Sequence, residues 1–206
     1  MRILCLLVAM LLAQKMYCQD SLDNILNNEV KVHQSIVRYV RASNSELGTI
    51  LYYRDGGLVA RRFNSATEEV SGDPVPAVDN VDYNAAGLGL SFDASSDGRV
   101  AVLRRFGAGR TRFTWFSRSG EITGTLGEPG DYLQPRMSPD GTRVAFTRPD
   151  TQTGNRDVWF IEIARGIASR LTTHVANDWY PVWSPDGRQL LFGSDRGGGT
   201  AMRVFL

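Results

Sequence analysis

A strand–turn–strand pattern that occurs twice in the second half of the sequence constrains the fold more than any other feature. The later copy runs from Asp178 to Asp195 and the earlier from Asp131 to Arg148, each with Ser-Pro-Asp-Gly between two apolar stretches. In such a turn proline sets φ at about −65°, aspartate can accept hydrogen bonds from its own backbone, and glycine adopts the left-handed conformation that closes a short hairpin. Both stretches therefore predict a hairpin.

The spacing of these turns identifies the repeating unit. The two turn aspartates stand 46 residues apart, which is the length of one blade of a β-propeller rather than of a helical repeat. A degenerate copy, Ala-Ser-Ser-Asp-Gly, places its aspartate 43 residues earlier. The residues expected to form the turns are Ser138, Pro139, Asp140, Gly141, Ser184, Pro185, Asp186, Gly187, Asp97 and Gly98.

Aromatic residues recur at a nearly constant distance from the turn aspartates. Trp115 follows its turn aspartate by 18 residues, in the copy whose turn is one residue shorter, and Trp159 and Phe205 follow theirs by 19. We therefore expect Trp115, Trp159 and Phe205 to occupy one structural position. Together with Trp183 they are predicted to pack between blades.

The strands around the turns are predicted to be covered on both faces. Val144 to Phe146 and Leu190 to Phe192 are apolar at successive positions, whereas a strand exposed on one face should alternate. Earlier, Ile50 to Phe63 predicts a hairpin with an Asp-Gly turn, and the prolines between Thr67 and Pro76 predict an edge strand. The sequence thus predicts an all-β fold, a partial β-propeller of about three to four four-stranded blades preceded by a short N-terminal helix.

The motifs of these repeats resemble a known family. The resemblance to the TolB-type, WD-like β-propeller repeat of bacteria covers about residues 48–206 and rests on L-Q-P-R-M-S-P-D-G-T-R-V-A-F, R-D-V-W-F-I-E-I-A-R-G, S-R-L-T and Y-P-V-W-S-P-D-G. The stretches I-L-Y-Y-R-D-G-G-L-V-A-R-R-F-N and F-T-W-F-S-R-S-G-E-I-T-G-T-L-G-E-P-G-D-Y resemble propellers attached to bacterial eukaryotic-like serine/threonine kinases and to some one-component transcriptional regulators. The resemblance implies a noncatalytic sensing or scaffolding propeller.

The N-terminal segment differs from the rest. One arginine precedes an eleven-residue apolar run, Ile3 to Ala13, which is short for a membrane span and is typical of a secretory signal. Residues 1–18 are therefore predicted to be a signal peptide of an exported, periplasmic or extracellular protein, with a buried N-terminal strand or helix as the alternative. Apolar residues at three- and four-residue steps from Asp20 to Ala42 predict an amphipathic helix, so 19–47 is assigned to a helix and linker and 48–206 to the propeller.

Composition and missing motifs exclude several functions. A net charge of +1 disfavours a nucleic-acid partner. Two histidines, and two cysteines confined to the first 18 residues, cannot build a Cys/His zinc cage. Kinase motifs and the Gly-x-Ser-x-Gly nucleophile elbow do not occur, and Gly107 to Gly109 is a turn rather than a phosphate loop. We therefore expect no enzymatic activity, no cofactor, no metal and no stable membrane span.

Two sets of polar residues remain as candidates. His174 with Asp178 could serve as a base or metal ligand, but a polar loop between blades is the favoured interpretation, and the recurring aspartates are expected to close turns rather than to bind calcium. Arginine and aromatic side chains often anchor interfaces. The candidate partner-binding loop residues are Arg105, Phe106, Arg110, Arg156 and Arg196.

The favoured function is a noncatalytic module that binds a protein or a ligand. One alternative is the sensor portion of a serine/threonine kinase or transcriptional regulator, and another is a propeller that gates a hydrolase, with catalysis on other sequence. At about 45 residues per blade, residues 48–206 amount to about three and a half blades. A piece of a larger propeller, or a ring completed by another chain, is therefore expected, with possible self-association through open blade edges.

Overall fold

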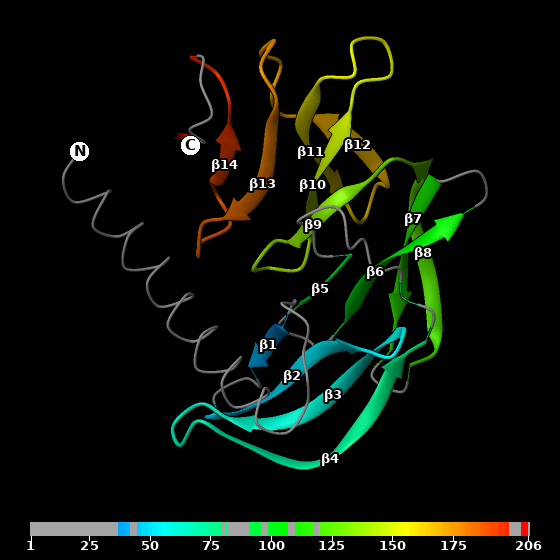
Figure 1. The fold of residues 1–206 in the computed structure, drawn as a ribbon, viewed down its shortest axis with the longest axis vertical. Helices are drawn as coiled ribbons and strands as arrows, with labels where there is room; N and C mark the ends of the chain where they lie inside the picture. The colour runs from blue at the N-terminus through cyan, green and yellow to red at the C-terminus, as the bar shows by residue number, and fades with distance from the viewer. Residues whose placement is uncertain are drawn as a thin grey trace, which may run out of the picture.

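Strands form all the regular structure that the computed structural model describes. The described residues are 37–41, 45–79, 81, 91–95, 99–106, 110–117, 120–197 and 203–205. Within them the strands form four antiparallel sheets that follow one another along the chain (Figure 1).

Each sheet is built from consecutive strands paired in chain order. The first contains β1 (Val37–Arg41), β2 (Leu47–Arg54), β3 (Gly57–Asn64) and β4 (Glu69–Val78). The second contains β5 (Phe92–Ala94), β6 (Val100–Phe106), β7 (Arg110–Phe116) and β8 (Ile122–Gly130). The third contains β9 (Leu133–Met137), β10 (Arg143–Pro149), β11 (Arg156–Glu162) and β12 (Ile167–Arg170), and the fourth contains β13 (Asp178–Trp183), β14 (Leu190–Ser194) and β15 (Arg203–Phe205).

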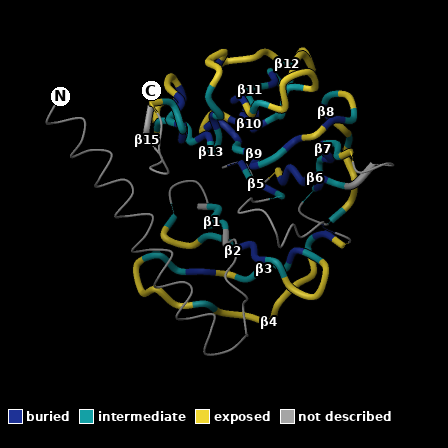
Figure 2. Tube along the Cα trace, turned by 45° about the horizontal axis from the view of Figure 1, so that its top comes forward, coloured by how far each residue is buried: buried dark blue, intermediate teal, exposed yellow. Residues whose placement is uncertain are grey.

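The sheets are arranged as blades of a propeller. The first strand of each sheet lies toward the middle of the molecule, where β1 contacts β5, β5 contacts β9 and β9 contacts β13, while β4, β8 and β12 lie at the outside (Figure 1). Figure 2 shows the buried residues concentrated in the inner strands and the exposed ones along β4 and the outer turns. The predicted all-β propeller of about three to four blades is confirmed.

The first sheet begins earlier in the chain than predicted. The helix expected from Asp20 to Ala42 is wrong over Val37–Arg41, because this segment is β1 and pairs with β2 along its whole length. Its sequence, Val-Arg-Tyr-Val-Arg, is rich in the β-branched and aromatic residues that favour strands, and pairing with β2 outweighs the helical spacing. The rest of the predicted helix and the signal peptide lie outside the described residues.

The first hairpin and the edge strand agree with the prediction. Arg54 pairs with Gly57, and the two residues between them, Asp55 and Gly56, have positive φ values of 49° and 87°. Positive φ at both central positions matches the two-residue turn that suits the twist of a hairpin. Among the described strands, the proline-containing β4 pairs only with β3 and forms the outer edge of its sheet.

The second strand of the third sheet is covered on both faces, as expected. Val144, Ala145 and Phe146 are all fully buried. Val144 and Phe146 belong to a core between the second and third sheets, where Phe146 packs against Phe113 and Tyr132. Since side chains alternate along a strand, Ala145 points the other way, toward β13 of the fourth sheet, which packs against β10.

The aromatic residues do not all share one position. Each pairs with a residue of the second strand of its sheet, in the pairs Trp115–Ala101, Trp159–Phe146 and Phe205–Phe192. Trp159 and Phe205 are equivalent, but Trp115 is shifted by one residue, so the predicted common position is wrong for it. In the β6–β7 hairpin three residues separate the last two paired residues, Phe106 and Arg110. In the β10–β11 hairpin six residues separate Pro149 and Arg156, and this difference in loop length changes the register. As a result, Trp115 and Trp159 enter the same core from opposite sheets.

The Ser-Pro-Asp-Gly turns join the first and second strands of the third and fourth sheets and have matching hydrogen bonds. In the earlier turn the Asp140 carboxylate accepts hydrogen bonds from Ser138 Oγ at 2.5 Å and from the Thr142 backbone N–H at 3.0 Å. Asp186 accepts the corresponding bonds at 2.6 and 3.0 Å. Gly141 and Gly187 have φ of 67° and 68°. Asp97 and Gly98 lie outside the described residues.

An arginine from each of two sheets reaches the turn of the next sheet. Arg99 donates to the carbonyl oxygen of Gly141 at 3.3 Å, and Arg143 donates to that of Gly187 at 2.6 Å. The Arg143 guanidinium also lies 4.6 Å from the centre of the Trp183 ring. These repeated contacts tie the turn of each blade to its predecessor.

Among the described residues, no helix is long and apolar enough to span a bilayer.

We expect Phe146→Ala to lower the free energy of unfolding by about 3–5 kcal/mol, because it opens a cavity in the core between the second and third sheets. Urea unfolding followed by tryptophan fluorescence measures this loss. Val175→Ala, at a side chain that is 90% exposed, is the control and should cost less than about 0.5 kcal/mol. Similar losses in both variants would show that this core does not hold the sheets together.

The turn aspartates should titrate at low pH. The hydrogen bond from Ser138, followed by that from Thr142, lowers the pKa of Asp140 from 3.8 to about 2. Because the folded pKa is lowered, the stabilisation is complete above the ordinary pKa and is lost as the pH falls toward 2. We expect Ser138→Ala to raise the Asp140 midpoint, measured by NMR of the carboxyl carbon. Asp186, whose own turn is intact in that variant, should keep its titration midpoint. An unchanged midpoint of Asp140 would contradict the assignment of its low pKa to the hydrogen bond from Ser138.

Candidate functional site

The innermost strands carry a row of three charged side chains and one valine, which we call the axial row: Arg38 of β1, Asp93 of β5, Arg136 of β9 and Val182 of β13. Asp93, Arg136 and Val182 pair with equivalent residues of the second strands, Ala101, Ala145 and Leu191. They therefore point toward the same side, that of the following sheet. These strands gather in the middle of the molecule (Figure 1).

Asp93 links three sheets. Its Oδ1 accepts a hydrogen bond from Arg38 Nε at 2.9 Å, and its Oδ2 accepts one from the backbone N–H of Met137 at 2.8 Å. The side chains of Arg38 and Asp93 are only 24% and 11% exposed. A shielded, charge-assisted pair of this kind is stronger than one on the surface. Both carboxylate oxygens of Asp93 are thus engaged within the fold.

Arg136 stands next to this pair with its charge uncompensated. Its Nη1 donates to the carbonyl oxygen of Pro135 at 2.8 Å, and among the described residues its guanidinium makes no ion pair. Burial, and then the positive charge of Arg38, lower the pKa of Arg136 to about 9, against the opposing effect of Asp93. Even at this pKa the guanidinium is charged at neutral pH. Two cations and one carboxylate therefore leave the row with a net charge of +1.

The backbone at Arg136 is held by neighbouring residues. Trp183 of the fourth sheet donates from Nε1 to the Arg136 carbonyl oxygen at 3.0 Å. Two positions earlier, the buried Gln134 accepts hydrogen bonds through Oε1 from Thr147 Oγ1 at 2.8 Å and from the Tyr180 backbone N–H at 3.0 Å. Arg136 therefore projects from a segment fixed to both its own sheet and the next.

The sequence contains a signal for this row, but it was missed. Asp93, Arg136 and Val182 each stand two residues before the serine of the turn that follows. Lining up the copies would have placed them at one position, although no motif marks them as functional. Arg38 could not have been found in this way, since its segment was predicted to be helical.

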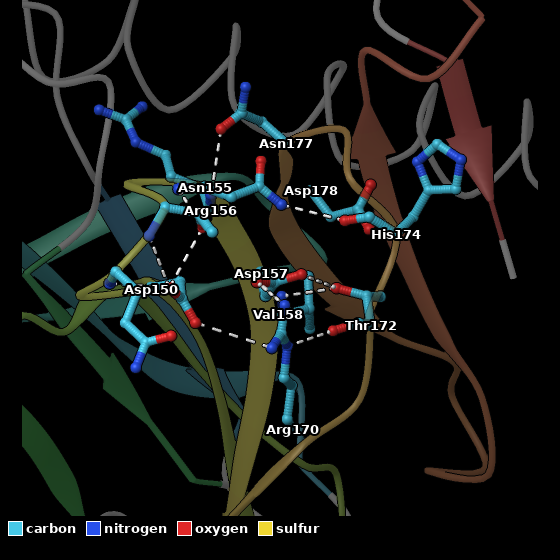
Figure 3. A network of polar contacts seen from close by, with 12 residues as sticks. Asp150, Asn155, Arg156, Asp157, Val158, Arg170, Thr172, His174, Asn177 and Asp178 are labelled. Atoms are coloured by element: carbon cyan, nitrogen blue, oxygen red, sulfur yellow. Dashed lines mark hydrogen bonds and ion pairs between the residues drawn. The ribbon is translucent and has the colours of Figure 1, made fainter.

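A second polar network closes the loops between the third and fourth sheets (Figure 3). The fully buried Asp157 accepts hydrogen bonds from Arg170 Nη2 at 2.6 Å and from Thr172 Oγ1 at 3.3 Å, while Thr172 Oγ1 accepts one from the Val158 N–H. Burial raises the pKa of Asp157, and Arg170 opposes this shift. Asn155 donates to the carbonyl oxygens of His174 and Ala176, both at 3.0 Å. These groups hold the loops together.

His174 and Asp178 do not form the pair that was considered from the sequence. His174 is exposed, and its Nδ1 accepts a hydrogen bond from the Ala176 N–H at 3.0 Å. Asp178 is fully buried and forms an ion pair with Arg196 at 2.6 Å. Arg196 is therefore an internal partner of Asp178, which corrects its assignment to a free partner-binding loop.

The other candidate loop residues belong to the hairpins between second and third strands. Arg110 and Arg156 are exposed at the starts of β7 and β11. The backbone N–H of Arg156 donates to Asn177 Oδ1 at 3.0 Å. The side chains of Arg105 and Phe106 lie outside the described part. The structure does not bring Arg110 or Arg156 to the axial row.

The axial row, with two arginines beside one carboxylate, suits the binding of an anionic group rather than of a metal cation. In the part of the chain that the structure describes, no group of three or more His, Cys, Asp or Glu side chains is placed to hold a metal ion.

Comparison with known proteins agrees with the fold. The family description "TolB beta propeller domain" matches residues 90–204, more than half of the chain. The chain is similar to a TolB-type protein of Agrobacterium tumefaciens, at 24% identity and a TM-score of 0.51 over 76% of this chain, and to TolB of Acinetobacter baumannii, at 20% identity and 0.50 over 82%. It is also 38% identical, over 73 residues, to the uncharacterized peptidase YuxL of Bacillus subtilis.

The chain spans only part of each of these relatives. It covers 52% of the Agrobacterium chain, 37% of the Acinetobacter chain and 11% of YuxL. The similarity to the two TolB-type structures lies in the propeller fold described above. On the match over residues 90–204, the protein belongs to the TolB beta propeller domain family.

Proposed function

We propose that this chain is a noncatalytic binding module that holds a protein or ligand at the axial row of its propeller. The observation that carries the proposal is the guanidinium of Arg136, which is charged, largely buried and without an ion-pair partner among the described residues. A desolvated charge in that position is costly unless a ligand compensates it. Binding an anionic group there would remove this cost.

The remaining polar residues support binding over catalysis. Asp157, Asp178 and Asp93 each accept a hydrogen bond from an arginine of the fold. A general base or nucleophile must instead be able to reach a substrate. These three carboxylates therefore hold blades and loops together.

Two alternatives have specific support. The identity to YuxL favours a propeller that gates a hydrolase whose catalytic residues lie on other sequence. The resemblance to kinase-attached propellers, carried by the segments from Ile50 and from Phe113, favours the sensor portion of a serine/threonine kinase or regulator. In both alternatives this propeller binds and a separate domain carries the catalytic or DNA-binding function. Sequencing the adjoining reading frame therefore distinguishes them.

We expect the purified chain to bind short peptides saturably without cleaving them. Isothermal titration with a panel of acetylated tripeptides measures binding, and mass spectrometry of the same mixtures after prolonged incubation measures cleavage. Cleavage that persists through purification would contradict a noncatalytic module. The absence of binding across the whole panel would contradict the binding of a protein segment at the axial row.

We further propose that the module is exported, on the basis of the arginine and the apolar run before Ala13. When the chain is expressed with a C-terminal tag in a Gram-negative host, we expect periplasmic protein whose mass shows cleavage between Ala13 and Cys18. A variant lacking residues 1–18 is the control and should stay in the cytoplasm. Uncut full-length chain in the cytoplasm would overturn the proposal.

A further inference from the structure

We infer that the axial row recognises a single carboxylate group of a partner peptide, with Arg136 as the residue that binds it. This inference rests on the proposed binding function and names the chemistry of the ligand. It follows from three properties of the row: its net charge, the geometry of the guanidinium and the rigidity of the segment that presents it.

The net charge favours a monoanion. Asp93 is neutralised by Arg38 at 2.9 Å, so one positive charge, that of Arg136, remains. One carboxylate would compensate it fully. A phosphate dianion would add a second negative charge close to Asp93, which acts on Arg136 through space, and like charges in a partly buried site repel.

The guanidinium has the donors that such a ligand needs. An arginine presents five N–H donors in a planar fork, and two of them can bind both oxygens of one carboxylate. Within the described structure the Arg136 side chain makes one hydrogen bond, from Nη1 to the Pro135 carbonyl oxygen. A lysine would offer the charge without this fork, which makes Arg136→Lys an informative variant.

The site is preorganised. Gln134 ties the strand to Thr147 and to the Tyr180 backbone, and Trp183 holds the Arg136 carbonyl oxygen. A side chain on a fixed backbone loses less freedom on binding, so more of the interaction appears as affinity. The contact of Trp183 with the Arg136 backbone also places a fluorophore beside the site.

Three probe peptides decide the inference: Ac-Ala-Ala-Ala-OH, Ac-Ala-Ala-Ala-NH2 and Ac-Ala-Glu-Ala-NH2. The first offers a C-terminal carboxylate, the last a side-chain carboxylate and the second neither. In isothermal titration the tighter of the two carboxylate peptides should bind about 10- to 100-fold more strongly than the neutral amide, and its identity tells which source of carboxylate is recognised. Equal affinity of all three overturns the inference but leaves the binding function intact.

Variants of the whole chain locate the contact. Arg136→Met should remove the preference for carboxylate peptides, Arg136→Lys should keep only part of it, and neither should change binding of the neutral amide. The control is Arg165→Met, at a guanidinium that is 69% exposed and lies on the β11–β12 turn. A preference that survives Arg136→Met, or that disappears equally in Arg165→Met, overturns the inference.

A direct measurement covers the case in which Arg136→Met does not fold. In the wild-type chain the Nε–Hε NMR signal of Arg136, assigned by its absence in Arg136→Lys, should shift on titration with the preferred carboxylate peptide and not with the amide. Inorganic phosphate at the same concentration should shift it less. A signal unmoved by either carboxylate peptide, or one that phosphate shifts more strongly, overturns the inference.

Discussion

The structure depends on the burial of sheet faces against neighbouring sheets. A single four-stranded sheet cannot form a core, because its two faces would stay in water. Here the second strands supply apolar residues to both sides, so that Val144 and Phe146 enter one core while Ala145 is covered from the other side. The sheets are therefore stable as a stack, and the specific hydrogen bonds between them set how they are stacked.

The parts of the fold that depend on local chemistry could be predicted from the sequence. The turns could be identified because proline, aspartate and glycine have definite backbone preferences, and Val144 to Phe146 because successive apolar residues leave a strand no solvent face. The strand β1 could not be predicted, because short segments take their structure from their partners and Val37–Arg41 has β2 beside it. The register of Trp115 depends on the length of one hairpin loop, which a count along the sequence does not show.

The candidate site was less predictable than the fold because its residues carry no motif. Arg136 looks like any strand arginine until the structure places it beside Arg38 and Asp93 at the centre of the molecule. Arg196 illustrates the opposite error, since its place near a loop tip suggested a surface for partners, whereas it forms an ion pair with the buried Asp178. In both cases the partner of each charge, rather than its position in the sequence, decides its role.

The contacts between sheets also have a direction. Arg99 and Arg143 extend from one sheet to the glycine turn of the following sheet, and the Gln134 side chain accepts a hydrogen bond from the backbone of the following sheet. The two faces of a sheet are therefore chemically different, so neighbouring sheets fit together in one order only. An additional blade, of whatever origin, would have to join this stack head to tail through unlike surfaces, and a two-fold symmetric union of like faces would leave these donors and acceptors unmatched.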